Sequence, residues 1–332
     1  MVKLKDIARE TGLTPSTISK ALNHSREISE ETTQLVIETA ARMGYVPKKK
    51  GQEATKNIGI ILPEVKSHYY ASLMEILCKE GEKRGCNMIT MLTSGYPVRL
   101  EPALEKILKY KPDGLIVGCG GTLWEEKMLA MRSRRVPVVA LRERADANCP
   151  IDSIYISGSY GVGQAVEHLL QLGHTKIGYL GEQNSSRRYL AFCEAMKQNH
   201  CSVNPAFVKQ TETRFEAGGY ETACELLKEP ELPTAVFACY DQFAFGAMKA
   251  FTERGLRIPE DISIVGYDNV EMADYYPVPL TSVTNPVEQM GITAVNILVN
   301  AIEEGERHVV QNVSLQTRLV VRKSTCQLVD CE

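Results

Sequence analysis

The sequence of 332 residues predicts an α/β protein, with an all-α helix-turn-helix head followed by two doubly wound parallel-sheet subdomains. Two short amphipathic segments lie within the first fifty residues, and apolar strand-like runs alternate with helical segments through the rest. The length also exceeds what a single hydrophobic core usually organises. We expect a head over residues 1–47, a short linker over 48–57 and a body over 58–332.

The head begins with two helices joined by a tight turn. Apolar residues recur there at steps of three to five, which gives each helix one apolar face. These residues are Ile7, Ala8, Leu13, Ile18 and Leu22. Gly12 suits a left-handed helix end, and Thr14 followed by Pro15 provides an N-cap and a first-turn proline. The pattern predicts a second helix that begins near Pro15.

A third helix is predicted from an N-cap at Ser29 to a stop at Gly44. The outward positions of the second helix are Ser16, Thr17 and Lys20, whose hydroxyls and cation suit phosphate oxygens and base edges in a major groove. The alternative is a small helical bundle that uses the same apolar spacing for its core alone. Because the turn, the proline and the polar face agree, we interpret the head as DNA-binding.

The charge distribution supports this interpretation. Residues 1–50 hold nine Lys or Arg against six Asp or Glu, whereas the remaining 282 residues hold 29 against 35. A basic head on an acidic body is the asymmetry expected of a tethered nucleic-acid-binding module. The run 48–50 of three lysines is typical of a solvated linker that adds salt-sensitive phosphate attraction.

Several other classes of protein are disfavoured. No apolar run approaches the ~20 residues of a membrane span, and no signal peptide precedes the first helix. Ten scattered cysteines without a C-x-x-C pair indicate reduced thiols in a cytoplasmic protein. No H-E-x-x-H or G-x-S-x-G motif occurs, so we expect no catalytic residue, no metal site and no cofactor. The glycines at 158, 161 and 163 fit tight strand-to-helix packing better than a phosphate loop.

The body alternates strand and helix in a parallel α/β pattern. Its predicted strands are 58–62, 88–92, 114–117, 136–141, 177–180, 235–238 and 262–265. A division near 151–157 predicts one subdomain over about 58–152 and 283–312, and another over about 153–282 and 313–332. A small ligand is expected between them, because pockets in such folds lie beyond the carboxyl ends of the strands.

Residues that follow the strands are therefore the candidates for ligand contact. Tyr69 and Tyr70 follow the first strand, where their rings would stack on a sugar ring or a base. The alternative for them is ordinary packing on a helix face. Tyr240 and Asp241 follow the strand 235–238, and Asn285 closes the last crossing strand. Polar residues at these positions favour a polar ligand.

Motifs throughout the chain resemble the lactose/galactose-repressor (LacI/GalR) family. They are the head itself, residues 58–63 (IGIILP), residues 167–174 (EHLLQLGH) and residues 264–269 (IVGYDN). The resemblance implies a bacterial transcription regulator, most simply a repressor. Its DNA-binding head would sit on a body resembling periplasmic sugar-binding proteins. It would act as a homodimer whose affinity for operator DNA changes when a small effector binds.

The resemblance implies that DNA contacts come from the head, at Lys3, Thr14, Pro15, Ser16, Thr17, Ser19, Lys20 and Asn23. Lys20 replaces the usual base-reading arginine, and Pro15 offers no side-chain hydrogen bond, so we expect an operator that differs from the family consensus. The segment before residue 58 is shorter than usual and lacks the leucine that wedges into the minor groove. We therefore expect little bending of the operator.

The resemblance also matches Arg188 with the family's effector-binding arginine and Asp268 with its hydroxyl-binding carboxylate. Arg142 and Arg214 depart from the family pattern and would bring three guanidiniums near one site. Guanidiniums suit carboxylate or phosphate, so a sugar, preferably an acidic or phosphorylated one, is the expected effector. The alternative is that Arg142 and Arg214 point to solvent. The alternative functions are a sugar-binding transport or sensor protein and, less strongly, a cytoplasmic enzyme.

Overall fold

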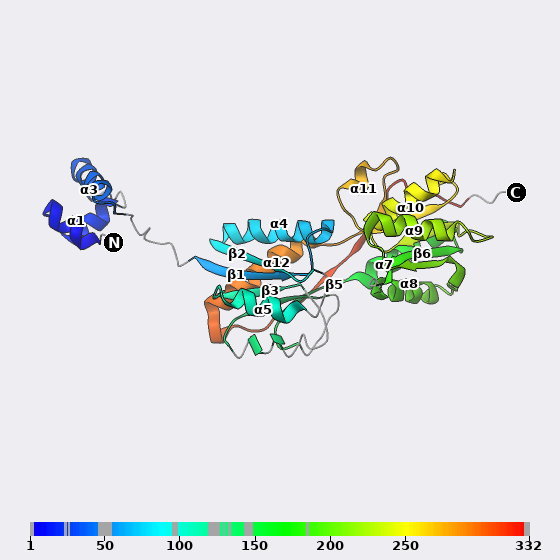
Figure 1. Cartoon of the computed structure of the whole chain (residues 1–332), viewed down its shortest axis with the longest axis horizontal. Coiled ribbons are helices and arrows are strands. Elements are labelled where there is room, and N and C mark those ends of the chain that lie inside the picture. The colour runs from blue at the N-terminus through cyan, green and yellow to red at the C-terminus, as the bar shows by residue number, and fades with distance from the viewer. Residues whose placement is uncertain are drawn as a thin grey trace. The chain divides into compact units, whose positions relative to one another are not determined.

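The computed structural model describes residues 3–22, 25, 27–45, 55–94, 99–118, 127–128, 130–131, 134–142, 149–183 and 186–328. The chain divides into two compact units, Met1–Thr55 and Lys56–Glu332. Figure 1 shows the helical first unit and the two sheets of the second. The expected linker 48–57 lies mostly outside the described residues.

The first unit consists of helices α1 (Leu4–Thr11), α2 (Pro15–Leu22) and α3 (Glu30–Arg42). Gly12 ends α1 with a φ of 69°, in the left-handed region that glycine adopts without steric cost. Ser29 caps α3 by accepting the backbone N–H of Thr32 at 3.3 Å. Ile7, Ile18 and Val36, one from each helix, are fully buried together. The predicted helices, caps and core of the head are confirmed.

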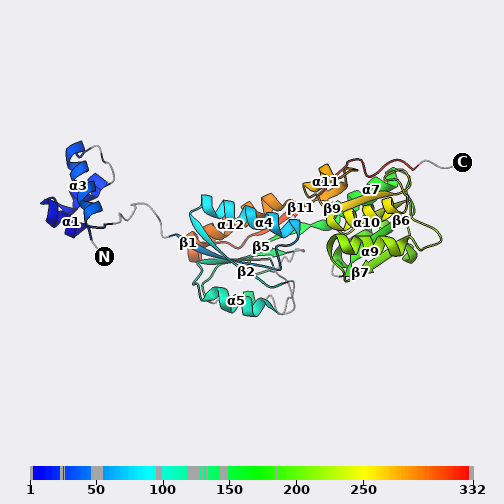
Figure 2. The same ribbon diagram turned by 45° about the horizontal axis from the view of Figure 1, so that its top comes forward.

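The first sheet of the second unit is wholly parallel. Its described strands, in spatial order, are β11 (Asn312–Gln316), β5 (Asp152–Ser157), β4 (Val138–Arg142), β3 (Gly114–Val117), β1 (Lys56–Leu62) and β2 (Cys86–Leu92). Helices α4 (His68–Lys83) and α12 (Val287–Glu304) pack together on one face, and α5 (Leu100–Leu108) lies on the other (Figure 2). Both faces are covered, which explains why the central strands β1, β3 and β4 are mostly apolar and buried.

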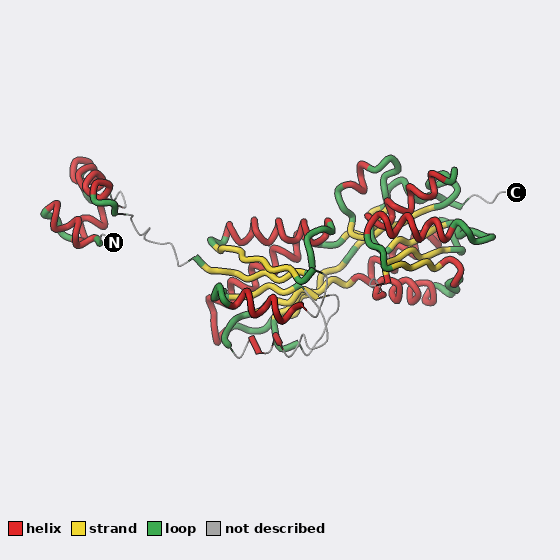
Figure 3. The backbone as a smooth tube through the Cα atoms, viewed as in Figure 1, coloured by secondary structure: helices red, strands yellow, loops and turns green. Residues whose placement is uncertain are grey.

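The second sheet contains five parallel strands and one antiparallel edge strand among the described residues. In spatial order they are β12 (Arg318–Val320), β10 (Thr281–Thr284), β9 (Ser263–Asp268), β8 (Ala235–Ala238), β6 (Ile177–Glu182) and β7 (Val208–Thr211). The antiparallel strand is β12. A purely parallel sheet was expected, and this edge strand is the exception. Its helices are α7 (Gly158–Gln171), α8 (Ser186–Gln198), α9 (Phe215–Leu226), α10 (Asp241–Glu253) and the short α11 (Met272–Tyr275) (Figure 3).

The chain passes between the two sheets after β5, after β10 and after β11. The expected boundaries at 152 and 312 are too early, because Asp152–Ser157 and Asn312–Gln316 are strands of the first sheet. We call residues 56–157 and 286–316 the first lobe, and residues 158–285 and 317–328 the second lobe. At the crossings, Gly161 donates its N–H to Thr317 Oγ1 at 2.9 Å. A Cβ on Gly161 would lie 2.3 Å from Val283 Cγ1, so close packing requires glycine there.

Among the described residues, no helix is both long enough and apolar enough to span a membrane.

Candidate functional site

The described DNA-contact candidates lie at the start of α1 and along α2. Thr14 accepts the N–H of Thr17 at 3.1 Å, which fixes the first turn of α2. Ile18 is fully buried and anchors the helix from its other side. The remaining candidates face outward: Lys3, Pro15, Ser16 and Lys20 are exposed, and Thr17 and Ser19 are half-buried. Asn23 lies outside the described residues. This arrangement leaves a row of hydroxyls and a cation accessible to a groove.

Lys20 forms an ion pair with Glu27, in the turn between α2 and α3. Both side chains are exposed, and the ion pair with Lys20 lowers the pKa of Glu27. The amine therefore contacts a carboxylate at the position where an operator base or phosphate would bind it. If DNA binds this amine as predicted, it would have to compete with Glu27 for the cation.

We expect Glu27→Gln to tighten operator binding about two- to fivefold, because an exposed ion pair is weak and one anionic group near the phosphates is removed. Fluorescence anisotropy with an operator selected from random DNA would measure the change. Glu38→Gln is the matched control, since Glu38 accepts a hydrogen bond from Gln34 on α3 and is not paired with Lys20. Unchanged or weaker binding by Glu27→Gln would contradict this competition.

The second lobe places three polar candidates in contact at the carboxyl ends of its strands. Arg188, in the first turn of α8, donates to the carbonyl oxygen of Cys239 at 2.7 Å and lies 3.5 Å from Asp268 Oδ1. Asn285, just after β10, donates to the same Asp268 oxygen at 2.6 Å. The guanidinium of Arg188 also stacks 4.1 Å above the ring of Tyr267. The result is an ordered set of donors and acceptors around one carboxylate.

Asp268 is held in an unusual state. It ends β9 with a φ of 103°, a conformation that side chains other than glycine rarely adopt. Burial raises its pKa to about 6, and the favourable charge of Arg188 and the hydrogen bond from Asn285 offset only part of that effect. Strained backbone and a shifted carboxyl pKa at a strand end are features that cluster at functional sites.

The first lobe contributes aromatic residues from the start of α4. Tyr69 and Tyr70 contact each other edge to face with 4.9 Å between ring centroids, and the Tyr69 hydroxyl contacts Met290 Sδ at 3.4 Å. Burial raises the pKa of Tyr69, and the negative charge of Asp268 adds to the shift. Both rings are half-buried. They also pack against the first-lobe core, as the packing alternative expects, and their contact with a ligand stays a prediction.

Tyr240 and Asp241 are built into the second lobe instead. Asp241 is fully buried, and its two oxygens accept from the Ser282 hydroxyl at 2.5 Å and the Val270 N–H at 2.8 Å. The Tyr240 hydroxyl donates to Glu182 at 2.8 Å. These contacts occupy both Asp241 oxygens and the Tyr240 hydroxyl within the second lobe. Asp241 and Tyr240 hold the strand ends in place.

Arg214 is half-exposed and lies between two carboxylates. Its Nε is 3.3 Å from Glu182 Oε1, at the end of β6, and its Nη2 is 3.7 Å from Glu64 Oε1, just after β1. Arg142 ends β4 and is half-buried. The side chain of Arg214 is thus partly exposed to solvent, and its charge is compensated by two carboxylates of the protein.

Glu64 and Glu182 were not among the predicted site residues. Each follows or ends a strand, which is the same signal that identified Tyr69 and Asp268. Isolated glutamates in a sequence are usually solvated, however, and nothing in the local pattern distinguishes these two.

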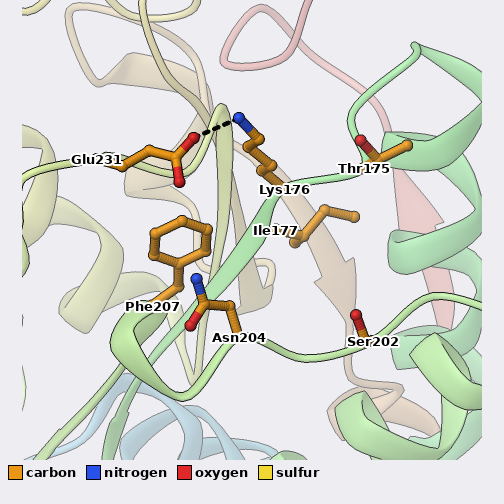
Figure 4. Close-up of a pocket in the computed structure, with 7 residues that line it drawn as sticks. All are labelled: Thr175, Lys176, Ile177, Ser202, Asn204, Phe207 and Glu231. Carbon is orange, nitrogen blue, oxygen red and sulfur yellow. Dashed lines mark hydrogen bonds and ion pairs between the residues drawn. The ribbon is translucent and has the colours of Figure 1, made fainter.

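A separate cavity of about 140 Å³ lies at the opposite, amino-terminal end of β6 (Figure 4). Its lining includes Ile177, Phe207 and an ion pair between Lys176 and Glu231. The Arg188 cluster lies beyond the carboxyl end of the same sheet, so this cavity belongs to a different edge of the second lobe.

Comparison with known proteins supports a DNA-binding head joined to a body of the periplasmic-binding-protein type. Residues 3–48 match the bacterial regulatory proteins of the lacI family, and residues 166–325 match the periplasmic binding protein-like domain. The HTH-type transcriptional repressor PurR of Haemophilus influenzae strain PittEE is 32% identical over 98% of this chain and 98% of its own length.

Solved structures share this fold over most of the chain. The lac repressor dimer bound to operator and the anti-inducer ONPF is 26% identical, with a TM-score of 0.80 over 98% of this chain and 99% of that one. A LacI family regulator from Enterococcus faecium with bound ribose is also 26% identical, with a TM-score of 0.73 over 82% of this chain and 100% of that one. The chain is thus a DNA-binding transcriptional regulator and not an enzyme, and it belongs to the lacI family of bacterial regulatory proteins.

Proposed function

We propose that this chain is a cytoplasmic, homodimeric repressor that binds operator DNA through α2. Its affinity for the operator changes, in either direction, when a sugar-like effector binds. The observation that carries the effector assignment is the contact set of Arg188, Asp268 and Asn285. A carboxylate flanked by a guanidinium and an amide can accept and donate to neighbouring hydroxyls of one ligand. Tyr69 supplies an aromatic surface for the ligand ring.

The charges at this site favour a neutral effector over the acidic or phosphorylated sugar expected at first. Arg188 faces Asp268, and Arg214 faces Glu182 and Glu64. A phosphate would need to compete with these carboxylates, whereas sugar hydroxyls bond equally well to both partners of an ion pair. The ribose bound by the Enterococcus faecium relative is consistent with such a ligand.

Calorimetric titration of the full chain would test this proposal. The panel is D-ribose, further neutral sugars, a uronate, a sugar phosphate and a purine base, each also tested for its effect on operator binding. We expect a neutral sugar to bind and to change operator affinity. Exclusive binding of the uronate or sugar phosphate would overturn the neutral assignment. Exclusive binding of the purine base would overturn the sugar class.

Effector binding is expected to weaken as the pH falls. Because burial raises the pKa of Asp268 to about 6, this carboxyl is ionised at pH 7.5 and takes up a proton below about pH 6. A protonated carboxyl loses attraction to Arg188 and one acceptor position, so effector affinity should fall by up to about tenfold per pH unit below the pKa. Titrations at pH 7.5, 6.5 and 5.5 would measure this dependence. A flat profile would contradict a role for the ionised form.

A further inference from the structure

We propose that Arg214 joins the two lobes beside the effector site and positions both of its halves, rather than binding the effector itself. This inference rests on the proposed function and assigns the regulation of that same site. Arg214 immediately precedes α9 in the second lobe. Its guanidinium lies near one carboxylate from each lobe, at 3.3 Å from Glu182 and 3.7 Å from Glu64.

Both carboxylates are mostly buried, with 8% and 13% of their side-chain surface exposed. Because so little of either carboxylate is exposed here, water compensates its charge only weakly, and the nearby guanidinium contributes more than it would beside an exposed carboxylate. Separating the lobes at this point would remove the cation from Glu64 in the first lobe. The contact therefore favours the lobe arrangement seen here.

The first-lobe side of the contact is fixed in place. The second carboxylate oxygen of Glu64 accepts the backbone N–H groups of Lys66 and Ser67. Ser67 in turn caps α4 by accepting the N–H of Tyr70. The carboxylate is thus part of the turn that begins the helix with the two tyrosines.

The second-lobe side is equally fixed. The Tyr240 hydroxyl donates to Glu182 at 2.8 Å and accepts the N–H of Phe215 at 2.9 Å. Phe215 follows Arg214 directly and has a φ of 62°, a strained value that the surrounding contacts must hold. Glu182 ends β6, the strand that leads into α8 and Arg188.

A second contact joins the lobes at the same place. Lys66 Nζ of the first lobe lies 5.0 Å from the ring centroid of Phe215, and Arg214 Cζ lies 4.5 Å from the same centroid. A cation over an aromatic ring is attractive at this distance. Two adjacent interactions therefore connect the turn before α4 with the turn before α9. The ion pair and the ring contact should respond together when one partner is removed.

Hydrogen–deuterium exchange of the full chain without added ligand tests this inference. In Arg214→Gln we expect the amides of residues 65–71, in the other lobe, to exchange about fivefold faster. In Glu64→Gln we expect the same acceleration for residues 213–219. Both substitutions break the same contact, the ion pair between Arg214 and Glu64. The double variant should therefore exchange no faster at either segment than the more affected single variant. Arg257→Gln is the control, since Arg257 pairs with Asp261 inside the second lobe.

Acceleration confined to the lobe that holds the substitution would overturn the proposal, as would additive effects in the double variant. Arg214→Lys keeps the charge but loses the fork, and we expect it to fall between wild type and Arg214→Gln. Equal effects of Arg257→Gln on residues 65–71 would also overturn it. Because no effector is used, failure here is distinct from failure of the sugar-binding assignment.

Discussion

Replacing Asp268 with asparagine is expected to weaken effector binding about a hundredfold and to make operator binding insensitive to the effector. Asp268 provides the ionised carboxylate between Arg188 and Asn285. Asparagine keeps the shape but presents an uncharged amide. One of its two terminal atoms becomes a donor, which cannot accept from a ligand hydroxyl.

The substitution should leave the fold intact, because asparagine tolerates positive φ better than most residues and Asp268 has a φ of 103°. Calorimetry with the effector found by the panel, together with operator anisotropy, would measure both properties. Asp261→Asn is the control, since Asp261 is paired with Arg257 away from the site. Effector affinity within threefold of wild type would show that Asp268 is not a ligand contact.

Gly219→Ala is expected to destabilise the second lobe by about 3 kcal/mol. A Cβ on this residue of α9 would lie 1.8 Å from the carbonyl oxygen of Phe243 on α10. The reciprocal contact from α10 to α9 is nearly as close, since a Cβ on Gly246 would lie 1.9 Å from the carbonyl oxygen of Glu216. The obstacle in each case is backbone, so a rotamer change cannot relieve it and the two helices must move apart.

Urea unfolding would measure this loss. Gly163→Ala provides the matched control, because Gly163 lies within α7 and a Cβ there meets no atom within 4 Å. We expect that substitution to be neutral or slightly stabilising, since alanine favours helix over glycine. Equal stability of the two variants would show that α9 and α10 can separate freely.

The head could be predicted in detail because its structure is determined locally. Gly12, Thr14 and Ser29 each act on the turn that contains them, and a residue's chemistry is enough to identify such a role. The strands at 114–117 and 235–238 were also predicted at their observed bounds, since both are short apolar runs between polar turns. The edge strand β12 was not, because only three residues form it and its pairing partner β10 lies earlier in the chain.

The candidate site could be predicted only in part. Arg188 and Asp268 stand next to strands, so chain position and resemblance both identify them. The role of Arg214 depends on Glu64, which belongs to the other lobe and is distant in sequence. No periodicity links such a pair. Asp241 shows the opposite case. Its position after a strand suggested ligand contact, whereas its complete burial in the structure indicates an internal role.

The three crossings between the sheets have a consequence for synthesis. The first lobe receives β11 from Asn312–Gln316, and the second receives β12 from Arg318–Val320. Neither lobe therefore forms from one continuous stretch of chain. The head emerges from the ribosome first, and its three helices share a core of their own. The two lobes can be completed only when residues near 320 have emerged from the ribosome. During translation the nascent protein has a DNA-binding unit without a finished sensor.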